Sequence, residues 1–193
     1  MPPKARITRD MILDAAFDLV RAEGHEALNV RTLAKRLGCS TQPILYNFAA
    51  VEELKDAVYQ RADEFHTAYI LPKGGEGADA LLELGLNYVR FGHEEKHLFR
   101  FLFESDRFGG MDFKGLLRWP GSDELVAILA EALGCPAAEA EKLFMTFFAV
   151  AHGLGSLLCN NAMEYDETKC AAMLETVFNG ALAALTSKGE EYA

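Results

Sequence analysis

Apolar residues recur at spacings of three and four along almost the whole chain of 193 residues, whereas the alternating pattern of strands is scarce. The first apolar stripe is formed by Ile12, Ala15, Ala16 and Leu19. Thr8 is a favourable N-cap residue and Gly24 a natural stop, so a first helix is expected to run to about residue 23. Continued along the chain, the pattern predicts an all-α fold of about nine helices.

The later helices follow from the same periodicity and from the residues that interrupt it. They are expected at about residues 51–68, 78–92, 94–104, 122–133, 137–160 and 166–186. The clearest break is LPKGGEG, residues 71–77, and the glycine-rich segment 105–121 is expected to be a loop with short helical pieces. The apolar run 143–159 is shorter than a membrane span, which favours a buried helix.

A candidate helix-turn-helix lies between the first and fourth helices. Asn29 can cap a helix over residues 30–37, and Gly38 can end it in the left-handed conformation. Ser40 can start a third helix over residues 41–48. The two helices can share a core made by Leu33, Leu37 and Ile44. Many helical hairpins have this pattern, so a hairpin without a role in DNA binding stays an alternative.

Charge is unevenly distributed along the chain. The whole sequence has 19 basic and 29 acidic residues, a net charge of −10. Residues 1–51 hold seven basic and five acidic residues, whereas the remainder holds twelve and twenty-four. This asymmetry is typical of a nucleic-acid-binding segment joined to an acidic domain, although chance scatter gives similar numbers.

The pattern over residues 8–56 resembles the tetracycline-repressor (TetR) family of transcription regulators. The matching segments are Asn29-Val30-Arg31, Leu33-Ala34, Gly38-Cys39-Ser40, Phe48 and Glu52-Glu53-Leu54. The resemblance implies a helix-turn-helix DNA-binding domain over residues 1–50 and a helical ligand-binding and dimerisation domain over residues 51–193. It also implies a cytoplasmic regulator, most often a repressor, that binds a palindromic operator and is released by a small apolar or aromatic effector.

Three departures from the family pattern fall near the third helix. The usual tyrosine of the family falls at Leu45, with Tyr46 one residue on, and the usual histidine falls at Asn47. The usual Ser-Lys pair, which caps the fourth helix and reaches a phosphate, falls at Ala50-Val51. We therefore expect one phosphate contact and one cap to be lost, with Lys55 as a possible substitute one turn further along.

The resemblance places the third helix in the major groove of DNA. The DNA-contacting residues that it implies are Arg31, Thr32, Ser40, Thr41, Gln42, Pro43, Tyr46, Asn47 and Lys55. Gln42 suits a bidentate contact with adenine, and Thr41 and Pro43 offer apolar contact to a thymine methyl group. Further candidates for phosphate contact are Lys4, Arg6 and Arg9. For each of these residues a solvated helix face is the alternative, and for Lys4 and Arg6 a disordered, merely soluble arm is a further one.

A homodimer is expected to form through the last two helices, about residues 137–160 and 166–186. Gly153, Gly155 and Ser156 are small enough to let another helix approach. The last helix carries a long apolar stripe, made of Ala171, Leu174, Val177, Phe178, Ala181, Leu182 and Leu185. Burial of this stripe inside a single-chain core is the alternative.

The aromatic residues of the middle helices suit an apolar effector pocket. The residues expected to line it are Phe91, Phe99, Phe103, Phe108, Trp119, Phe144, Phe148 and His152. Aromatic residues at helical spacing also form ordinary cores, and a histidine on an apolar face is often a hydrogen-bonded core residue. His93 and His97 have the spacing of a metal pair but lie in an exposed segment.

Other functions have less support. No Ser-His-Asp set, glycine-rich phosphate loop or metal constellation is recognisable, so neither an enzyme nor a bound cofactor is expected. The four cysteines lack metal-like spacing and indicate a reducing cytoplasm. The remaining alternative is a helical protein that binds a small molecule or a partner and retains only vestigial DNA affinity.

Overall fold

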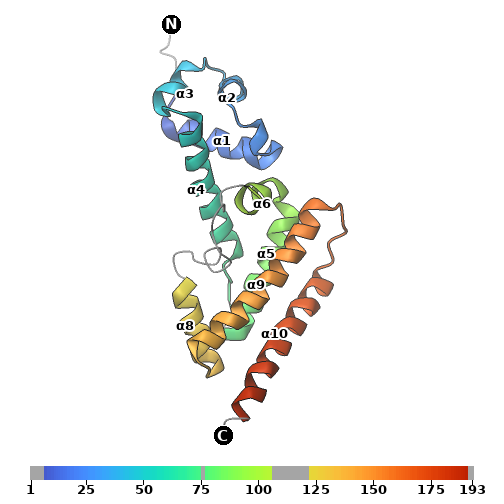
Figure 1. The fold of residues 1–193 in the computed structure, drawn as a ribbon. Coiled ribbons are helices and arrows are strands. Elements are labelled where there is room, and N and C mark those ends of the chain that lie inside the picture. The colour runs from blue at the N-terminus through green and yellow to red at the C-terminus, as the bar shows by residue number, and fades with distance from the viewer. Residues whose placement is uncertain (1–6, 75–76, 106–121, 191–193) are drawn as a thin grey trace. The chain divides into compact units, whose positions relative to one another are not determined.

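The computed structural model describes residues 7–74, 77–105 and 122–190, and of residues 185–190 the backbone alone. Within these ranges the protein has nine α-helices, one short 3-10 helix and no strand (Figure 1). The prediction of an all-α fold is thereby confirmed. The predicted loop over residues 105–121, together with Phe108 and Trp119, lies outside the described ranges apart from Ser105.

The helix bounds follow the apolar periodicity closely. The elements are α1 Arg9–Glu23, η1 His25–Ala27, α2 Val30–Leu37, α3 Gln42–Asn47, α4 Val51–Ile70, α5 Gly77–Glu94, α6 Lys96–Phe103, α8 Ser122–Leu133, α9 Ala137–Asn160 and α10 Glu167–Glu190. Thr8 caps α1 as predicted, because its Oγ1 accepts a hydrogen bond of 3.2 Å from Met11 N–H. The third helix begins one residue later than predicted, and Thr41 makes no side-chain cap bond there.

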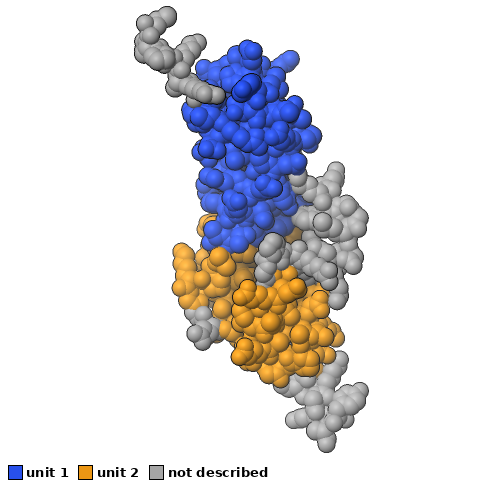
Figure 2. Space-filling view, turned by 90° about the vertical axis from the view of Figure 1, so that its left-hand side faces the viewer, with its two compact units in different colours: residues 1–68, 95–105 blue, residues 69–94, 106–193 orange. Residues whose placement is uncertain are grey.

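Two compact units divide the chain by their internal contacts (Figure 2). Unit 1 comprises residues 1–68 and 95–105, and unit 2 comprises residues 69–94 and 106–193. Most of α4 and all of α6 therefore belong to the same unit as α1, α2 and α3. The expected functional division at residue 50 stays a prediction, because packing does not show which helices carry out which function.

The core of unit 1 is built around α1, which packs against α2, α3 and α6. Its fully buried side chains include Ile12, Val20, Leu33, Ile44, Leu54 and Val58. Removing each such side chain from water stabilises the fold by roughly 1.5–3 kcal/mol. The end of α1 is tied to the start of α6, because Arg21 Nε donates to Glu95 Oε2 at 2.8 Å. This core holds the helix-turn-helix as one body with α4.

The core of unit 2 is built around α9, which packs against α5, α8 and α10 (Figure 1). A Cβ added to Gly92 on α5 would lie 2.8 Å from the Cα of Gly155 on α9. Gly155 therefore brings two helices of the same chain together, which corrects the expectation that it serves the approach of a second subunit. Leu174 and Phe178 of the α10 stripe are likewise buried within the chain.

The length and mean hydropathy of α9 would suffice to cross a membrane. However, its buried side, which includes Leu143, Phe147 and Ala151, lies in the core of unit 2. This packing agrees with the interpretation of the apolar run as a buried helix.

Candidate nucleic-acid interface

The turn between α2 and α3 has the local geometry that its sequence predicts. Asn29 Oδ1 accepts a hydrogen bond of 2.9 Å from Thr32 N–H and so caps α2. Gly38 ends α2 with a φ of 64°, a left-handed conformation that favours glycine. The backbone N–H of Cys39 donates to Ala34 O at 3.0 Å, which closes the helix end. These bonds set where α3 starts.

The short helix α3 has one buried face and one exposed face. Ile44 and Phe48, four residues apart, are each only 1% exposed. On the opposite face Gln42 is exposed, Leu45 is 52% exposed and Tyr46 is 83% exposed. Because positions i, i+3 and i+4 are neighbours on a helix, these three side chains form one continuous surface, which we name the α3 outer face. This face combines an amide, an aliphatic group and a phenol.

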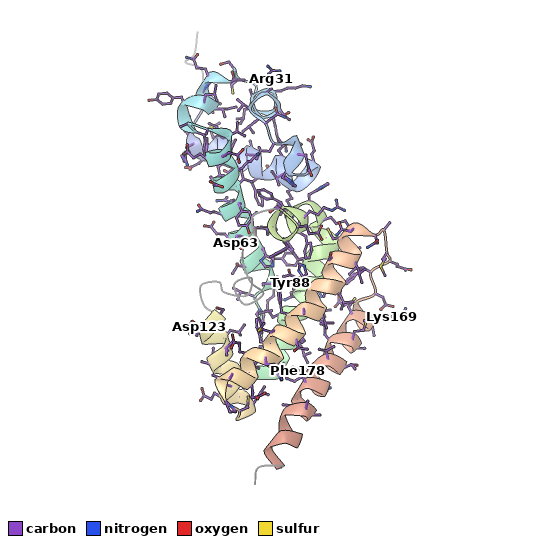
Figure 3. The ribbon with its side chains drawn as sticks, in the orientation of Figure 1. Arg31, Asp63, Tyr88, Asp123, Lys169 and Phe178 are labelled. Atoms are coloured by element: carbon purple, nitrogen blue, oxygen red, sulfur yellow. The ribbon has the colours of Figure 1, made fainter. Side chains whose placement is uncertain are left out.

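The nine residues predicted to contact DNA differ in exposure. Arg31 on α2 is exposed (Figure 3), as are Ser40, Gln42 and Tyr46. The half-buried members of the set are Thr32, Thr41, Pro43, Asn47 and Lys55. Asn47 Nδ2 donates to Pro43 O at 2.7 Å, so its amide group is directed back along α3. All nine lie in unit 1, and their contact with DNA stays a prediction.

The turn before α4 is held by a side chain of α4, although the serine that the family pattern expects is missing. Glu53 Oε2 accepts a hydrogen bond of 2.8 Å from Ala49 N–H. This bond, followed by the hydrogen bond from Arg9, holds the pKa of the Glu53 carboxyl below its usual range. Lys55 Nζ lies 3.0 Å from Glu52 Oε1, so the proposed substitute for the missing lysine is held in a surface ion pair.

Leu45 is the member of the α3 outer face that sequence reasoning missed. It stands where the family pattern has a tyrosine, and it was not expected to contact DNA. The signal was the helical spacing itself: once Ile44 and Phe48 are both placed inward, the residue after Ile44 must face outward. A large aliphatic side chain that is half exposed on this face is a candidate for apolar contact.

The residues predicted to bind an effector fall into both units. In unit 1 Phe99 is buried and half-buried Phe103 lies with its ring centroid 5.1 Å from that of Phe99. Phe103 also meets the ring of His66 at 4.9 Å, and burial lowers the pKa of His66 to about 4, so this imidazole is neutral at pH 7. Sequence reasoning did not single out His66, which stands within the charged pattern of α4.

In unit 2 the predicted effector residues gather between α5 and α9. Tyr88 Oη lies 2.9 Å from His152 Nδ1 (Figure 3 labels Tyr88), and the ring of Phe148 lies between these two and Phe144. Phe91 is fully buried against Tyr69. His152 is therefore a hydrogen-bonded histidine in an aromatic cluster. A role of the cluster in effector binding stays a prediction.

Two surface hollows lie along the outward sides of α9 and α10. The larger, of about 650 Å³, is lined by Ala138, Glu141, Lys142, Met145, Thr146, Ala149 and Val150. The smaller, of about 310 Å³, is lined by Val150, Ala172, Met173, Thr176 and Val177. None of the predicted effector residues within the described ranges lines either hollow. Both belong to the helices expected to form the dimer, and they present mainly apolar groups.

Comparison with known proteins finds no matching family model. Two curated relatives are similar over 78 residues at 31% identity: tetracycline repressor protein class D from Escherichia coli and class H from Photobacterium damsela subsp. piscicida. The match covers 40% of this chain and 36% of each relative. The chain thus spans about a third of the length of the curated relatives it matches.

Solved structures resemble the fold over nearly the whole chain. A TetR-like transcriptional regulator from Rhodococcus sp. RHA1 has a TM-score of 0.65 at 17% identity and covers 92% of this chain and 99% of its own. A TetR-family regulator from Streptomyces coelicolor has a TM-score of 0.55 at 22% identity and covers 98% of both chains. The multidrug binding protein EbrR, complexed with imidazole, has a TM-score of 0.54 at 22% identity and covers 88% of both. At these identities the likeness concerns the fold.

Proposed function

We propose that this protein is a transcription regulator of the TetR family, that it binds an operator in DNA through α3, and that its DNA affinity changes when a small molecule binds. The α3 outer face carries this proposal. Gln42, Leu45 and Tyr46 leave a hydrogen-bonding group and two large apolar surfaces exposed on a rigid helix. Such an exposed face has the chemistry that base edges require.

The acidic character of the chain does not oppose this function. The N-terminal 51 residues have two more basic than acidic residues, so the segment that would meet phosphate is the less acidic part. Arg31 lies at the start of α2, is exposed and forms no ion pair within the described residues of the chain. It is our candidate for clamping phosphate or reading guanine. Base reading on α3 needs hydrogen bonds and methyl contacts more than charge.

The proposed assembly is a homodimer through α9 and α10 that reads two half-sites. A six-residue α3 contacts only a few base pairs, and a symmetric dimer multiplies that specificity. The mainly apolar hollows along the outward sides of α9 and α10 support this surface, because a second copy would remove them from water.

The proposed effector is small and apolar or aromatic, and its release of the operator would act by population shift. The aromatic cluster around Tyr88 and His152 supports this chemistry. The cytoplasmic repressor role follows from the same family membership and is part of the proposal. The multidrug binding protein EbrR, which shares the fold and is complexed with imidazole, supports a small-molecule effector.

The experiment that tests the proposed function is selection of bound sequences from random double-stranded DNA. A palindrome with two half-sites about one helical turn apart is the expected result. Gln42→Ala is then expected to lose about 1–3 kcal/mol of binding on the selected site and to relax preference at one base pair. Gln60→Ala, which removes an exposed glutamine from α4, is the matched control and should bind as the wild type does. Absence of enrichment by the wild type would overturn the function.

A further inference from the structure

Arg9, the first residue of α1, makes three contacts at the junction between α3 and α4. Its Nη1 donates a hydrogen bond of 2.6 Å to the backbone carbonyl of Asn47, the last residue of α3. The same nitrogen lies 3.0 Å from Glu53 Oε1 on α4. The guanidinium carbon lies 4.0 Å from the centroid of the Phe48 ring. Arg9 thus connects three helices of unit 1 from one position.

Glu53 completes this arrangement from the other side. One carboxylate oxygen accepts from Arg9, and the other accepts from Ala49 N–H at 2.8 Å, in the turn between α3 and α4. The low pKa of Glu53 keeps the carboxylate ionised at neutral pH. We name the set Arg9, Asn47 O, Ala49 N and Glu53 the α3–α4 clamp.

A helix as short as α3 needs such support. Isolated helices of six residues are unstable in water, and Thr41 supplies no side-chain cap at the beginning of α3. The Asn47 carbonyl is among the last carbonyls of α3, which lack a partner within the helix. The Arg9 guanidinium satisfies it and places a positive charge at the negative end of the helix dipole.

The clamp also holds the turn that leads into α4. The Glu53 carboxylate reaches back from the first turn of α4 and accepts a hydrogen bond from Ala49 N–H in that turn. The bridge through Arg9 then joins that turn to the end of α3. The position of α3 relative to α4 therefore depends on two side chains that lie outside the α3 outer face.

We propose that Arg9 and Glu53 are positioning residues that set the orientation of α3 and thereby its discrimination between DNA sequences. Arg9 is an exposed cation near the proposed DNA-binding surface, so sequence reasoning made it a phosphate contact. In the structure, however, its guanidinium donates hydrogen bonds to Asn47 O and Glu53 within the protein. This inference rests on the proposed function, since it concerns how α3 is presented to DNA.

The two roles of Arg9 predict different salt dependences. Loss of a phosphate contact reduces the slope of log Kobs against log [salt] by about 0.9 and weakens binding to every sequence alike. Loss of a positioning contact leaves that slope unchanged and weakens binding to the selected operator alone. A misaligned base-reading hydrogen bond is expected to lower operator affinity roughly tenfold.

Glu53 gives a sharper test, because charge and positioning predict opposite signs. Glu53→Gln removes a negative charge from near DNA, which by charge alone strengthens binding to all sequences. The clamp predicts that the same change weakens operator binding by roughly tenfold, since Gln cannot form the ion pair with Arg9. Asp14→Asn is the matched control: it removes the same charge and an α1–α4 ion pair, Asp14 with Arg61 at 3.1 Å, that does not touch α3.

The experiment measures binding of Arg9→Gln, Glu53→Gln and Asp14→Asn to the operator selected by the wild type and to a shuffled duplex, over a salt series. The expected result is a lowered operator-to-shuffled affinity ratio for Arg9→Gln and Glu53→Gln, with an unchanged salt slope, and an unchanged ratio for Asp14→Asn. If Arg9→Gln does not fold, as checked by thermal unfolding, Glu53→Gln and its control decide.

Two results overturn the clamp while leaving the proposed function intact. One is an equal loss on both duplexes with a reduced salt slope for Arg9→Gln, which would make Arg9 a phosphate contact. The other is operator binding by Glu53→Gln that matches or exceeds that of the wild type. Failure of the wild type to select any sequence would instead overturn the proposed function together with this inference.

Discussion

The close approach of α5 and α9 at Gly92 makes a single added methyl group a stringent test of the packing in unit 2. A Cβ at position 92 would lie 2.8 Å from both the Cα and the carbonyl oxygen of Gly155, closer than real Cβ contacts. Backbone atoms cannot rotate away, so the two helices would have to separate. Overpacking of a core costs about 1–3 kcal/mol, and a backbone clash belongs at the upper end. The better helix propensity of alanine offsets about 0.5–1 kcal/mol of this cost.

We therefore expect Gly92→Ala to lower the free energy of unfolding by about 2 kcal/mol, which at roughly 2–4 °C per kcal/mol lowers Tm by about 4–8 °C. Gly85→Ala should also lower Tm, because its Cβ would lie 2.5 Å from the buried Phe147 ring. Gly74→Ala is the control, since its Cβ would meet no atom within 4 Å. Circular dichroism melts at one fixed protein concentration measure all three. Equal melting temperatures for Gly92→Ala and Gly74→Ala would refute the reasoning.

The other predictions concern DNA reading, assembly and pH. Leu45→Ala should weaken operator binding roughly fourfold by loss of apolar contact, and operator binding by this variant should not change when the contacted thymine is replaced by dU. Leu71→Ala, the control at a residue that is 55% exposed in the wild type, should bind the operator normally. If replacement by dU still weakens binding by Leu45→Ala, the contact is refuted. Met173→Glu should shift the protein toward monomer in sedimentation velocity. Met163→Glu is the control and should not, although Met163 is 51% exposed and Met173 is 50% exposed. A dimer that persists in Met173→Glu contradicts the proposed interface. The pKa of His66 is about 4 in the folded protein and ordinarily 6.5, so the unfolded chain binds more protons between these two pH values. The free energy of unfolding should therefore fall by up to about 3 kcal/mol as the pH falls from 6.5 to 4. Denaturant melts of His66→Leu should show a smaller loss over this pH range, and a pH dependence equal to that of the wild type would contradict the assignment.

The local rules of helix formation were sufficient to predict most elements of this fold. Thr8 and Asn29 cap the helices that they were expected to cap, and Gly38 adopts the left-handed conformation expected of it. These features depend only on neighbours within four residues, so the local sequence determines them. The bounds of α9 agree with the predicted range of 137–160 for the same reason.

Contacts between distant segments could not be predicted in this way. Gly155 was expected to serve a second subunit, but its small size serves the approach of α5. Arg9 was expected to contact phosphate, but its guanidinium reaches Asn47 and Glu53, which lie 38 and 44 residues away. A charged or small residue has several possible partners, and the sequence alone does not choose among them.

The sequence by itself determined the helical class and the two helices joined at Gly38, because hydrophobic spacing, caps and a glycine turn are local signals. Only the tertiary structure decided which helical faces are left open. Leu45 lies outside because Ile44 and Phe48 are buried in the core of unit 1, and the α3–α4 clamp exists because α1 brings Arg9 to that junction. Burial is a property of how helices pack together, so the exposed surface available to DNA follows from the packing of unit 1 and from no single segment of the chain.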